Sequence, residues 1–588
     1  MIHPGYRLRL YLLTALVLTG FGALITRLYD FQIERQDEFT GMMPTTSTIT
    51  VREPGVRGEI FDRYGVQLAR NIIHYELAFN LEEIHKAHDA ARARKPGGDP
   101  PEPPAEPVGP PAADAAARQP DIVEIFREQV IAPLEAMPAQ KGLIRNFSAT
   151  AMRVHYRTHA GLVPFSYRSD LTYDEFAKCG ELNLTIPGVF LTTRPQRVYP
   201  YGALASHVLG YIQPWEPADI PETAKRRFNH YIGDPKGADG VETSMNQVLR
   251  GQEGITTLLK NENGRIIRMI DRVPPAEGAR LTLTLDARAQ LYVENVLREY
   301  TGRAAAVVME VETGEVIAMA SIPDYNPNDF VPSISEARLA EYEANKRMDP
   351  FSNRCIRSFV PGSTFKVPTA IAGIMEGMAG RSFTCTGQVT YGNKPIRCWI
   401  AGKGSHGTLS LSKAIQQSCN PYFMILANTI GPKKMADNMD ILHLGRRTGI
   451  ELPAESPGIL PGNQAWRMSG SNRVMTPALT AMLAIGQGDA MATPLQLCAV
   501  TACVANGGRY FEPRIVKTAV AADGRVLIPD KPKLTADLIA QGVNPKDMEL
   551  LRKGMWMAVN QPGGTAGRAK IEDIEVAAKT GTAQAQVD

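Results

Sequence analysis

The sequence has almost no net charge for its size. Its 588 residues carry 64 basic and 61 acidic side chains, which leaves a formal charge of +3 at neutral pH. No long basic stripe interrupts this balance. Proteins that bind nucleic acid concentrate positive charge on one face, so an RNA or DNA partner is not expected. The length allows several domains, each with its own core.

Charge is absent from one stretch near the N-terminus. Leu10 to Thr26 is an apolar run without a charged residue, close to the length of a membrane-spanning helix. Arg7 and Arg9 precede the run, which favours a cytoplasmic N-terminus. A cleaved signal peptide is the alternative, but no clear small-x-small cleavage site follows. We therefore expect an uncleaved signal anchor in residues 1–30 and an exported chain after it.

Large apolar residues are nearly absent from another segment, residues 88–120. Proline, alanine and glycine dominate there, so the segment cannot form a core, and we expect a disordered insertion. Helical patterning resumes at Asp121 to Leu134. Alternating and periodic apolar residues predict further elements. These are a hairpin in residues 57–69, a strand in 281–286, a helix in 287–300, a hairpin in 304–320, and helices around 367–378 and 411–417.

A Ser-x-x-Lys motif stands at the start of one expected helix. A Pro-Gly pair breaks the structure before Ser363, and an apolar run begins after Lys366. Residues three apart share one face of a helix, so Lys366 lies beside Ser363. A serine hydroxyl needs a base to become a nucleophile. A lysine can act as that base only where burial or a nearby cation lowers its pKa.

Two further motifs follow in order. Ser418-Cys419-Asn420 lies downstream, and Lys579-Thr580-Gly581-Thr582 lies near the C-terminal end. Each has a plain structural reading, because serine and asparagine cap helices and Lys-Thr-Gly can form a turn. The ordered set is much harder to explain by chance. It is the signature of penicillin-binding transpeptidases and serine β-lactamases, and the chain resembles this superfamily from about residue 286 onward.

The preceding region resembles the pedestal of class B penicillin-binding proteins in the amino-acid sequence of residues 57–69, 199–212 and 237–242. The resemblance implies a multidomain α/β (α+β) chain. An anchor in residues 1–30 would be followed by a mainly-β pedestal in 31–285. A transpeptidase domain in 286–588 would have an antiparallel sheet flanked by helices. Family members continue past this point with further strands and a helix, so the resemblance implies a truncated transpeptidase domain.

The resemblance assigns the catalytic roles. Ser363 attacks a carbonyl carbon, and neutral Lys366 takes its proton. Ser418 relays protons to the leaving or incoming amine, and Asn420 holds the substrate amide and the lysine. The implied reaction takes the D-alanyl-D-alanine end of a peptidoglycan stem peptide, expels the last D-alanine and passes the acyl group to an amine. β-Lactams would acylate the same serine, and the chemistry needs no cofactor.

The third motif would form the substrate-binding side. In the family, backbone N–H groups of the nucleophile and of the residue matching Thr582 bind the oxyanion. Lys579 and Thr580 suit a substrate that ends in a carboxylate. Gly581 allows close approach to an edge strand, which would pair with an extended peptide.

Three of the seven cysteines and one histidine fall close together in the sequence. Cys385, Cys398, His406 and Cys419 form a Cys3His set, a standard combination for tetrahedral zinc. A Cys385–Cys398 disulfide is the alternative, favoured by an oxidising compartment, and the residues alone leave the two equally open. If residues 418–420 are extended, Cys419 points away from its neighbours. Some elongation-type relatives bind zinc at matching positions, so the resemblance favours a structural zinc.

The resemblance is to the elongation type, a penicillin-binding protein 2. This choice depends on the Cys3His set and on the amino-acid sequence from Asn263-Gly264-Arg265 to Pro274-Pro275. It implies a single-pass protein of the bacterial inner membrane with its bulk in the periplasm. The implied partners are a rod-shape membrane glycan polymerase and elongation scaffold proteins. A division-specific relative and a β-lactam sensor without transpeptidase activity are the alternatives.

Overall fold

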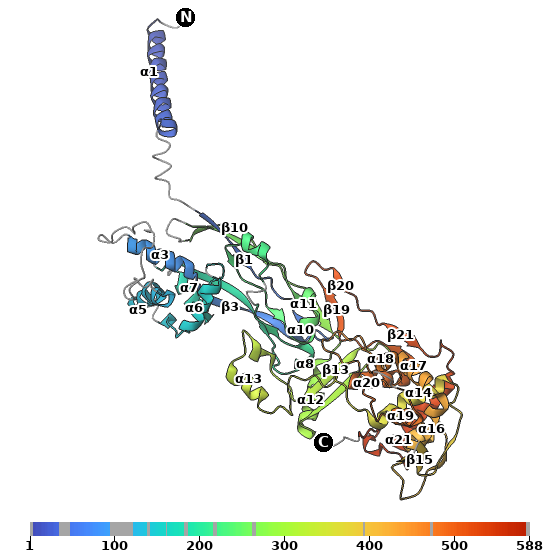
Figure 1. Cartoon of the computed structure of the whole chain (residues 1–588). Coiled ribbons are helices and arrows are strands. Elements are labelled where there is room, and N and C mark those ends of the chain that lie inside the picture. Colours follow the sequence, from blue (N-terminus) through green and yellow to red (C-terminus); the bar gives the residue numbers. More distant parts are fainter. Residues whose placement is uncertain are drawn as a thin grey trace, which may run out of the picture.

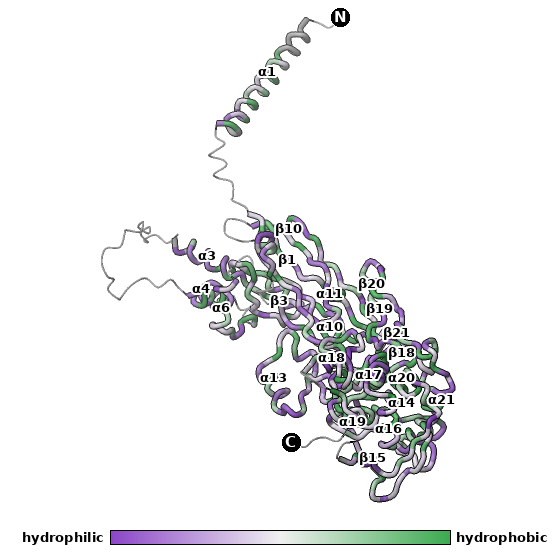
Figure 2. Tube along the Cα trace, turned by 45° about the vertical axis from the view of Figure 1, so that its right-hand side comes forward, coloured by the Kyte–Doolittle hydropathy of each residue, from purple (hydrophilic) through white to green (hydrophobic). Residues whose placement is uncertain are grey.

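The computed structural model describes residues 4–34, 47–93, 121–137, 142–159, 161–180, 186–215, 220–260, 266–391, 394–470 and 474–583. Its first element is helix α1 (Pro4–Tyr29), which continues into a short π-helix, η1 (Asp30–Glu34). The 18-residue window Leu12–Tyr29 has a mean hydropathy of 1.6 and is not buried against other residues. Figure 2 shows its apolar residues with no neighbouring element to cover them. By length and composition, this helix fits the expected membrane span.

Strands dominate the first half of the chain after α1 (Figure 1). They are β1 (Ser47–Glu53), β2 (Ile60–Phe61), β3 (Gln67–Phe79), β4 (Phe165–Leu171), β5 (Val189–Val198), β6 (Ile212–Gln213), β7 (His230–Tyr231), β8 (Lys236–Gly237), β9 (Gly254–Lys260), β10 (Ile266–Val273) and β11 (Arg280–Leu283). One sheet has the order β10-β9-β1-β7, and a second includes β11-β2-β3-β4, with β5 also paired to β3. The expected hairpin in residues 57–69 is confirmed, because β2 pairs antiparallel with β3. The Asp62 carboxylate fixes its turn by accepting hydrogen bonds from the N–H groups of Tyr64 and Val66.

Short helices pack beside these strands. They are α3 (Leu81–Ala93), α4 (Ile122–Phe126), η2 (Arg127–Ile131), α5 (Ala132–Ala136), α6 (Ala149–His159), α7 (Tyr173–Cys179), α8 (Ser206–Leu209), α9 (Glu222–Arg227), α10 (Gly240–Ser244) and α11 (Asn246–Leu249). Phe79, Phe126 and Tyr167 form the centre of a separate small core with α3 to α6. The predicted start of the insertion at residue 88 is too early, because α3 continues through Ala93 with an amphipathic pattern. Residues 94–120 lie outside the described residues, as do Asn263–Arg265.

A buried ion network joins the elements of this first region. The Glu242 carboxylate, fully buried at the start of α10, accepts hydrogen bonds from Arg57 at 2.5 Å and Arg197 at 2.8 Å. The Tyr199 hydroxyl donates to the same carboxylate at 3.1 Å. Burial alone would raise the pKa of Glu242, but the two guanidinium groups outweigh it, and its pKa lies below its ordinary value. The network therefore holds β5 and α10 together through paired charges.

Helices dominate the second half of the chain (Figure 1). The first elements are α12 (Ala287–Tyr300), β12 (Ala304–Met309), β13 (Val316–Ile322), η6 (Pro327–Phe330), α13 (Glu336–Glu343), η7 (Gly362–Phe365), α14 (Lys366–Met375), β14 (Phe383–Cys385), β15 (Gln388–Tyr391), β16 (Lys394–Arg397) and β17 (Gly407–Leu409). They are followed by α15 (Leu411–Gln416), α16 (Asn420–Ile430), α17 (Pro432–Ile441), α18 (Gln464–Met468), α19 (Pro477–Ala484), α20 (Pro494–Ala505), β18 (Arg509–Phe511), β19 (Val516–Val520), β20 (Val526–Ile528), β21 (Leu534–Asp537), α21 (Pro545–Asn560) and η8 (Gly567–Ala569). The largest apolar core lies here, and α14 and α16 cross its centre. The predicted helix in 287–300 and hairpin in 304–320 are both confirmed.

The two halves of the chain share a sheet. β19 pairs antiparallel with β11, from Arg280–Val520 to Leu283–Val516, and β20 extends the sheet by pairing with β19. The full order is β20-β19-β11-β2-β3-β4. Strands from both sides of residue 285 therefore lie in one hydrogen-bonded layer, and the fold is the expected mixture of α and β.

The edge strand expected at Lys579 to Thr582 is not formed. Residues 575–583 form no strand, and the Ala578 N–H donates to the Met555 carbonyl within α21. A cavity of about 320 Å³, lined by residues 305–307 and 577–579, separates this segment from β12. A strand needs a hydrogen-bonded partner, and across this gap none is within reach.

Candidate active site

The Ser363 motif lies where the chain turns into α14. Gly362 has φ +56°, and its N–H donates to the Gly486 carbonyl at 2.9 Å. A Cβ on Gly362 would lie 2.4 Å from the Thr582 carbonyl oxygen, so only glycine fits. Residues 362–365 form one 3-10 turn, and Lys366 begins the α-helix. This turn places the Ser363 backbone directly beside the Lys-Thr-Gly segment.

Lys366 is completely buried, yet its ammonium group has no carboxylate partner. Nζ donates to the Asn420 side chain at 2.6 Å, the Ser418 carbonyl at 2.8 Å and the Ser418 hydroxyl at 3.1 Å. Burial lowers the pKa of Lys366 to about 7, and the nearby positive charge of Lys579 contributes to the decrease. A large fraction of Lys366 is therefore neutral near pH 7, as a general base must be.

The Ser418-Cys419-Asn420 segment sends its side chains in two directions. Ser418 has φ +51°, in the left-handed region, and Cys419 is extended before α16 begins at Asn420. The segment is therefore not uniformly extended as expected. Ser418 and Asn420 nevertheless both contact Lys366, and the Cys419 side chain joins a separate cluster. The strained backbone at Ser418 is what allows this division.

Lys579 completes a row of polar groups. Its Nζ donates to the Ser418 hydroxyl at 2.9 Å and to the Thr580 carbonyl at 2.7 Å. Burial lowers the pKa of Lys579 to about 8. The Ser418 hydroxyl therefore lies between two lysines, Lys366 and Lys579. A Cβ on Gly581 would lie 2.7 Å from a side-chain carbon of Thr364, so this segment packs tightly against the nucleophile turn.

A cleft of about 1010 Å³ opens over these groups. Ser363, Ser418, Asn420, Thr580 and Thr582 all line it. All eight predicted catalytic and substrate-binding residues therefore lie in or against one site. Among the hydrogen bonds of the described residues, none joins Ser363 to Lys366, because the lysine donates to the Ser-x-Asn motif instead.

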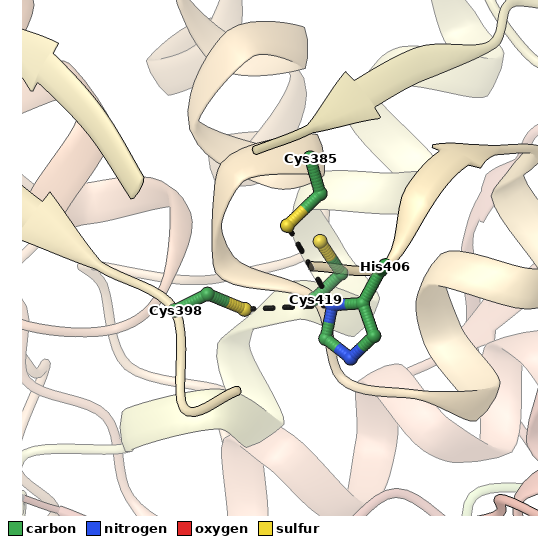
Figure 3. A group of neighbouring side chains, drawn as sticks. All are labelled: Cys385, Cys398, His406 and Cys419. Atoms are coloured by element: carbon green, nitrogen blue, oxygen red, sulfur yellow. Dashed lines mark hydrogen bonds between the residues drawn. The ribbon is translucent and has the colours of Figure 1, made fainter. Parts of the chain in front are cut away.

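The four predicted metal ligands form a compact cluster (Figure 3). Cys385 ends β14, Cys398 follows β16, His406 precedes β17, and Cys419 precedes α16. Their four ligand atoms all lie within 4.8 Å of one another. The His406 Nδ1 lies 3.6 Å from the sulfur atoms of both Cys385 and Cys398. Residues from four elements therefore converge on one point directly behind the Ser-x-Asn motif.

The cluster has the dimensions of a zinc site. A sulfur about 2.3 Å and a nitrogen about 2.0 Å from one tetrahedral centre are about 3.5 Å apart. The two observed separations, 3.6 Å each, are close to this value. All seven cysteines are free thiols, so the alternative Cys385–Cys398 disulfide is not formed. A hydrogen bond from Cys419 lowers the pKa of Cys398 and raises that of Cys419, so Cys398 is the member of the pair that ionises. A thiolate is the form that binds metal.

Comparison with known proteins agrees with this geometry. The penicillin-binding protein transpeptidase domain matches residues 304–587, and the penicillin-binding protein dimerisation domain matches residues 52–283. This chain belongs to the penicillin-binding proteins. A relative named peptidoglycan D,D-transpeptidase MrdA, from Salmonella typhimurium, is 28% identical over 576 residues, which cover 97% of this chain and 84% of the relative. MrdA from Escherichia coli K12 is 27% identical over 582 residues, which cover 97% and 82%.

Solved structures also match most of this penicillin-binding protein. The penicillin-binding protein PBP2 from Helicobacter pylori, solved in complex with MreC, gives a TM-score of 0.68 with 25% identity. The match covers 92% of this chain and 90% of that one. The expected family and the expected mixed architecture are therefore confirmed.

The sequence motifs missed part of the cleft of this penicillin-binding protein. Arg397, Trp399 and residues 563–565 also line it. Residues 563–565 belong to a loop after α21 that carries no motif, and only the fold brings it here. Arg397 and Trp399 flank Cys398, so their position beside a candidate ligand was the one available signal.

Proposed function

We propose that this protein is a peptidoglycan D,D-transpeptidase that works through an acyl-serine intermediate. The observation that carries the proposal is the environment of Lys366. A buried lysine with a pKa near 7 lies against the Ser-x-Asn motif, beneath a cleft that Ser363 lines. The relatives named D,D-transpeptidase support the same reaction.

In the proposed reaction, the Ser363 oxygen attacks the carbonyl carbon of the D-alanyl-D-alanine bond. Neutral Lys366 takes the hydroxyl proton, after exchanging one of its present hydrogen bonds for Ser363. The Ser418 hydroxyl, which lies between the two lysines, returns a proton to the departing D-alanine amine. An incoming amine then attacks the acyl-serine, and the same groups carry its proton away. Water in place of the amine would give carboxypeptidase activity.

The substrate would be held by the other wall of the cleft. Lys579 and Thr580 offer a cation and a hydroxyl to the terminal carboxylate. The N–H groups of Ser363 and Thr582 are the proposed oxyanion donors. Thr582 lies beside Gly362, one residue from the nucleophile, so both donors can reach one oxygen.

We propose that Cys385, Cys398, His406 and Cys419 bind a structural zinc. A bound zinc would supply a cross-link between four elements, and it would take no part in acyl transfer. The cross-link would hold Cys419 and thereby fix Ser418 and Asn420 on either side of it. Metal analysis of the purified protein should find one zinc per chain. Absence of zinc together with a cross-linked Cys385–Cys398 peptide would reject the site.

The cellular role is proposed from the relatives and from α1. We propose that α1 anchors the protein in the inner membrane and that the rest of the chain acts in the periplasm during cell elongation. The Helicobacter relative is solved with MreC, which supports an elongation scaffold protein as one partner. A membrane glycan polymerase is the second proposed partner. We also propose that the pedestal and the transpeptidase domain meet near residue 285, between β11 and α12.

The test is covalent labelling with benzylpenicillin, read by intact mass and peptide mapping. One stable adduct on Ser363, absent from Ser363→Ala, is expected. An adduct on another residue, or none on the folded protein, would reject the proposed nucleophile. Release of D-alanine from a donor peptide with transfer to an amine then separates a transpeptidase from a β-lactam sensor, which would acylate without turnover.

A further inference from the structure

The wall of the active-site cleft carries a positive charge that the proposed reaction does not use. Arg397, at the end of β16, lines the cleft and is exposed to solvent. Among the described residues it has no ion-pair partner, and no residue that lines the cleft is acidic. In the proposed function, Lys579 and Thr580 bind the terminal carboxylate of the substrate. Arg397 therefore offers a second site for negative charge.

The position of Arg397 is fixed from two sides. Its carbonyl oxygen accepts a hydrogen bond at 3.1 Å from the side chain of Asn420, which also contacts Lys366. The next residue, Cys398, belongs to the Cys3His cluster. β16 also pairs with β15 up to Arg397 itself. An arginine whose backbone is held in this way keeps its side chain on the wall of the cleft, where it remains exposed to solvent.

Trp399 adds an apolar surface at the same place. The side chain lines the cleft and is 56% exposed, which is unusual for so large an apolar group. It is nevertheless held, because its ring N–H donates to the Gln417 carbonyl at 2.8 Å. The ring also lies 5.3 Å from the His406 ring. An immobilised, exposed indole and an unpaired guanidinium group that line one cleft form a surface for a side chain that is apolar and ends in an anion.

We propose that Arg397 and Trp399 recognise a second carboxylate on the donor peptide, carried by a side chain that precedes the D-alanyl-D-alanine unit. Trp399 contacts the methylene groups of that side chain, and Arg397 binds its carboxylate with two parallel N–H donors. The inference rests on the proposed transpeptidase function and adds substrate specificity to it. Benzylpenicillin has a single carboxylate, to which Lys579 and Thr580 would donate hydrogen bonds. Its reaction therefore does not need Arg397.

The experiment compares donors that differ only in this charge. Synthetic donors of the form acyl-Xaa-D-alanyl-D-alanine carry glutamate or 2-aminoadipate at Xaa, and matched donors carry the corresponding side-chain amides. D-Alanine release is measured with the full chain in detergent and a fixed amine acceptor. We expect kcat/KM to be about tenfold higher for a carboxylate donor than for its amide, mainly through KM.

The arginine variants decide the assignment. Arg397→Gln should remove the preference, and Arg397→Lys should retain part of it, since a lysine keeps the charge without the paired donors. Arg381→Gln is the matched control, because Arg381 is an exposed arginine of the same half that does not line the cleft. Equal rates for carboxylate and amide at both side-chain lengths, or a preference that persists in Arg397→Gln, would overturn the inference.

Benzylpenicillin separates this inference from the proposed function. Acylation of Ser363 at an unchanged rate in Arg397→Gln, together with loss of donor preference, supports both. Acylation of Ser363 without any donor preference in the unaltered protein overturns only the role of Arg397. A folded protein that does not acylate at all overturns the proposed function itself.

Discussion

The two halves of the chain bury charge in opposite ways. In the first half, the Glu242 carboxylate is surrounded by Arg57 and Arg197, so each buried charge has an opposite partner. In the second half, Lys366 donates only to neutral acceptors, and the charge that shifts its pKa most is the like charge of Lys579. The first arrangement keeps its groups ionised, whereas the second makes a lysine give up its proton near neutral pH.

The contrast shows two uses of a buried charge: an ion pair that stabilises the fold, and an unpaired lysine that is prepared to act as a base. A buried ion pair holds two elements together. Removing one partner leaves the other charge unpaired in the low-dielectric interior, which destabilises the fold. An unpaired buried lysine costs stability, and the fold accepts that cost where a base is needed. Changing the two sites should therefore affect different properties, rate at Lys366 and stability at Glu242.

Lys366→Arg should cause the largest effect. Arginine keeps the size and hydrogen-bonding capacity of the side chain, but it does not deprotonate at neutral pH and cannot act as a base. We expect acylation by benzylpenicillin to slow by about 10²–10⁴-fold in stopped-flow or mass-based assays. Lys413→Arg is the control, because Lys413 occupies a second Ser-x-x-Lys spacing but donates to Gln416 outside the cleft. Unchanged acylation in Lys366→Arg would remove the general-base role.

Glu242→Gln should instead reduce stability. The substitution leaves two buried guanidinium groups without their counter-ion, so the free energy of unfolding should fall by about 3–5 kcal/mol in urea titrations. Glu341→Gln removes a solvent-exposed partner of Arg338 and should change stability by less than about 1 kcal/mol. A Glu242→Gln protein as stable as the Glu341→Gln control would show that the paired charges contribute little.

Removing the proposed zinc should have an intermediate effect on the chemistry. Cys398→Ser should lose the metal and slow acylation by about tenfold, because Ser418 and Asn420 lose the cross-link between them. Cys498→Ser changes a cysteine outside the cluster and should retain both zinc and rate. Zinc content is measured by elemental analysis alongside the acylation rate. Full activity in a metal-free Cys398→Ser protein would separate the cluster from the catalytic motif.

Lys579→Gln should also slow acylation, because Lys579 binds the carboxylate, but the effect of interest here is the smallest of the series, a shift in pH dependence. The pKa of Lys366 is about 7, so acylation should rise as the pH increases through 7 and the lysine loses its proton. Removing the charge of Lys579 takes away one cause of the lowered pKa, and the midpoint should move to higher pH. The measurement is the acylation rate from pH 5.5 to 9, normalised to its plateau. A midpoint that stays or moves down would contradict the coupling between the lysines.

The sequence predicted those features that depend on local pattern or motif. The hairpins and the helix after Asp286 follow from periodicity, whereas the set of residues around Lys366 is expected from the resemblance of three ordered motifs to a known family. The left-handed conformation of Ser418 could not be predicted in the same way, because the partners of its hydroxyl, Lys366 and Lys579, are distant in sequence. The absence of a strand at Lys579 also depends on a long-range gap beside β12. Arg397 and Trp399 reach the cleft through contacts distant in sequence, with Asn420 and Gln417, which no local pattern predicts.

The pairing of β11 with β19 affects the order in which the chain can fold. Leu283 is paired with Val516, so one side of β11 remains open until more than two hundred further residues have left the ribosome. An exposed strand edge over that interval is a site for wrong pairing. Because contacts so distant in sequence form slowly, the growing chain should depend on chaperones until β19 has been synthesised.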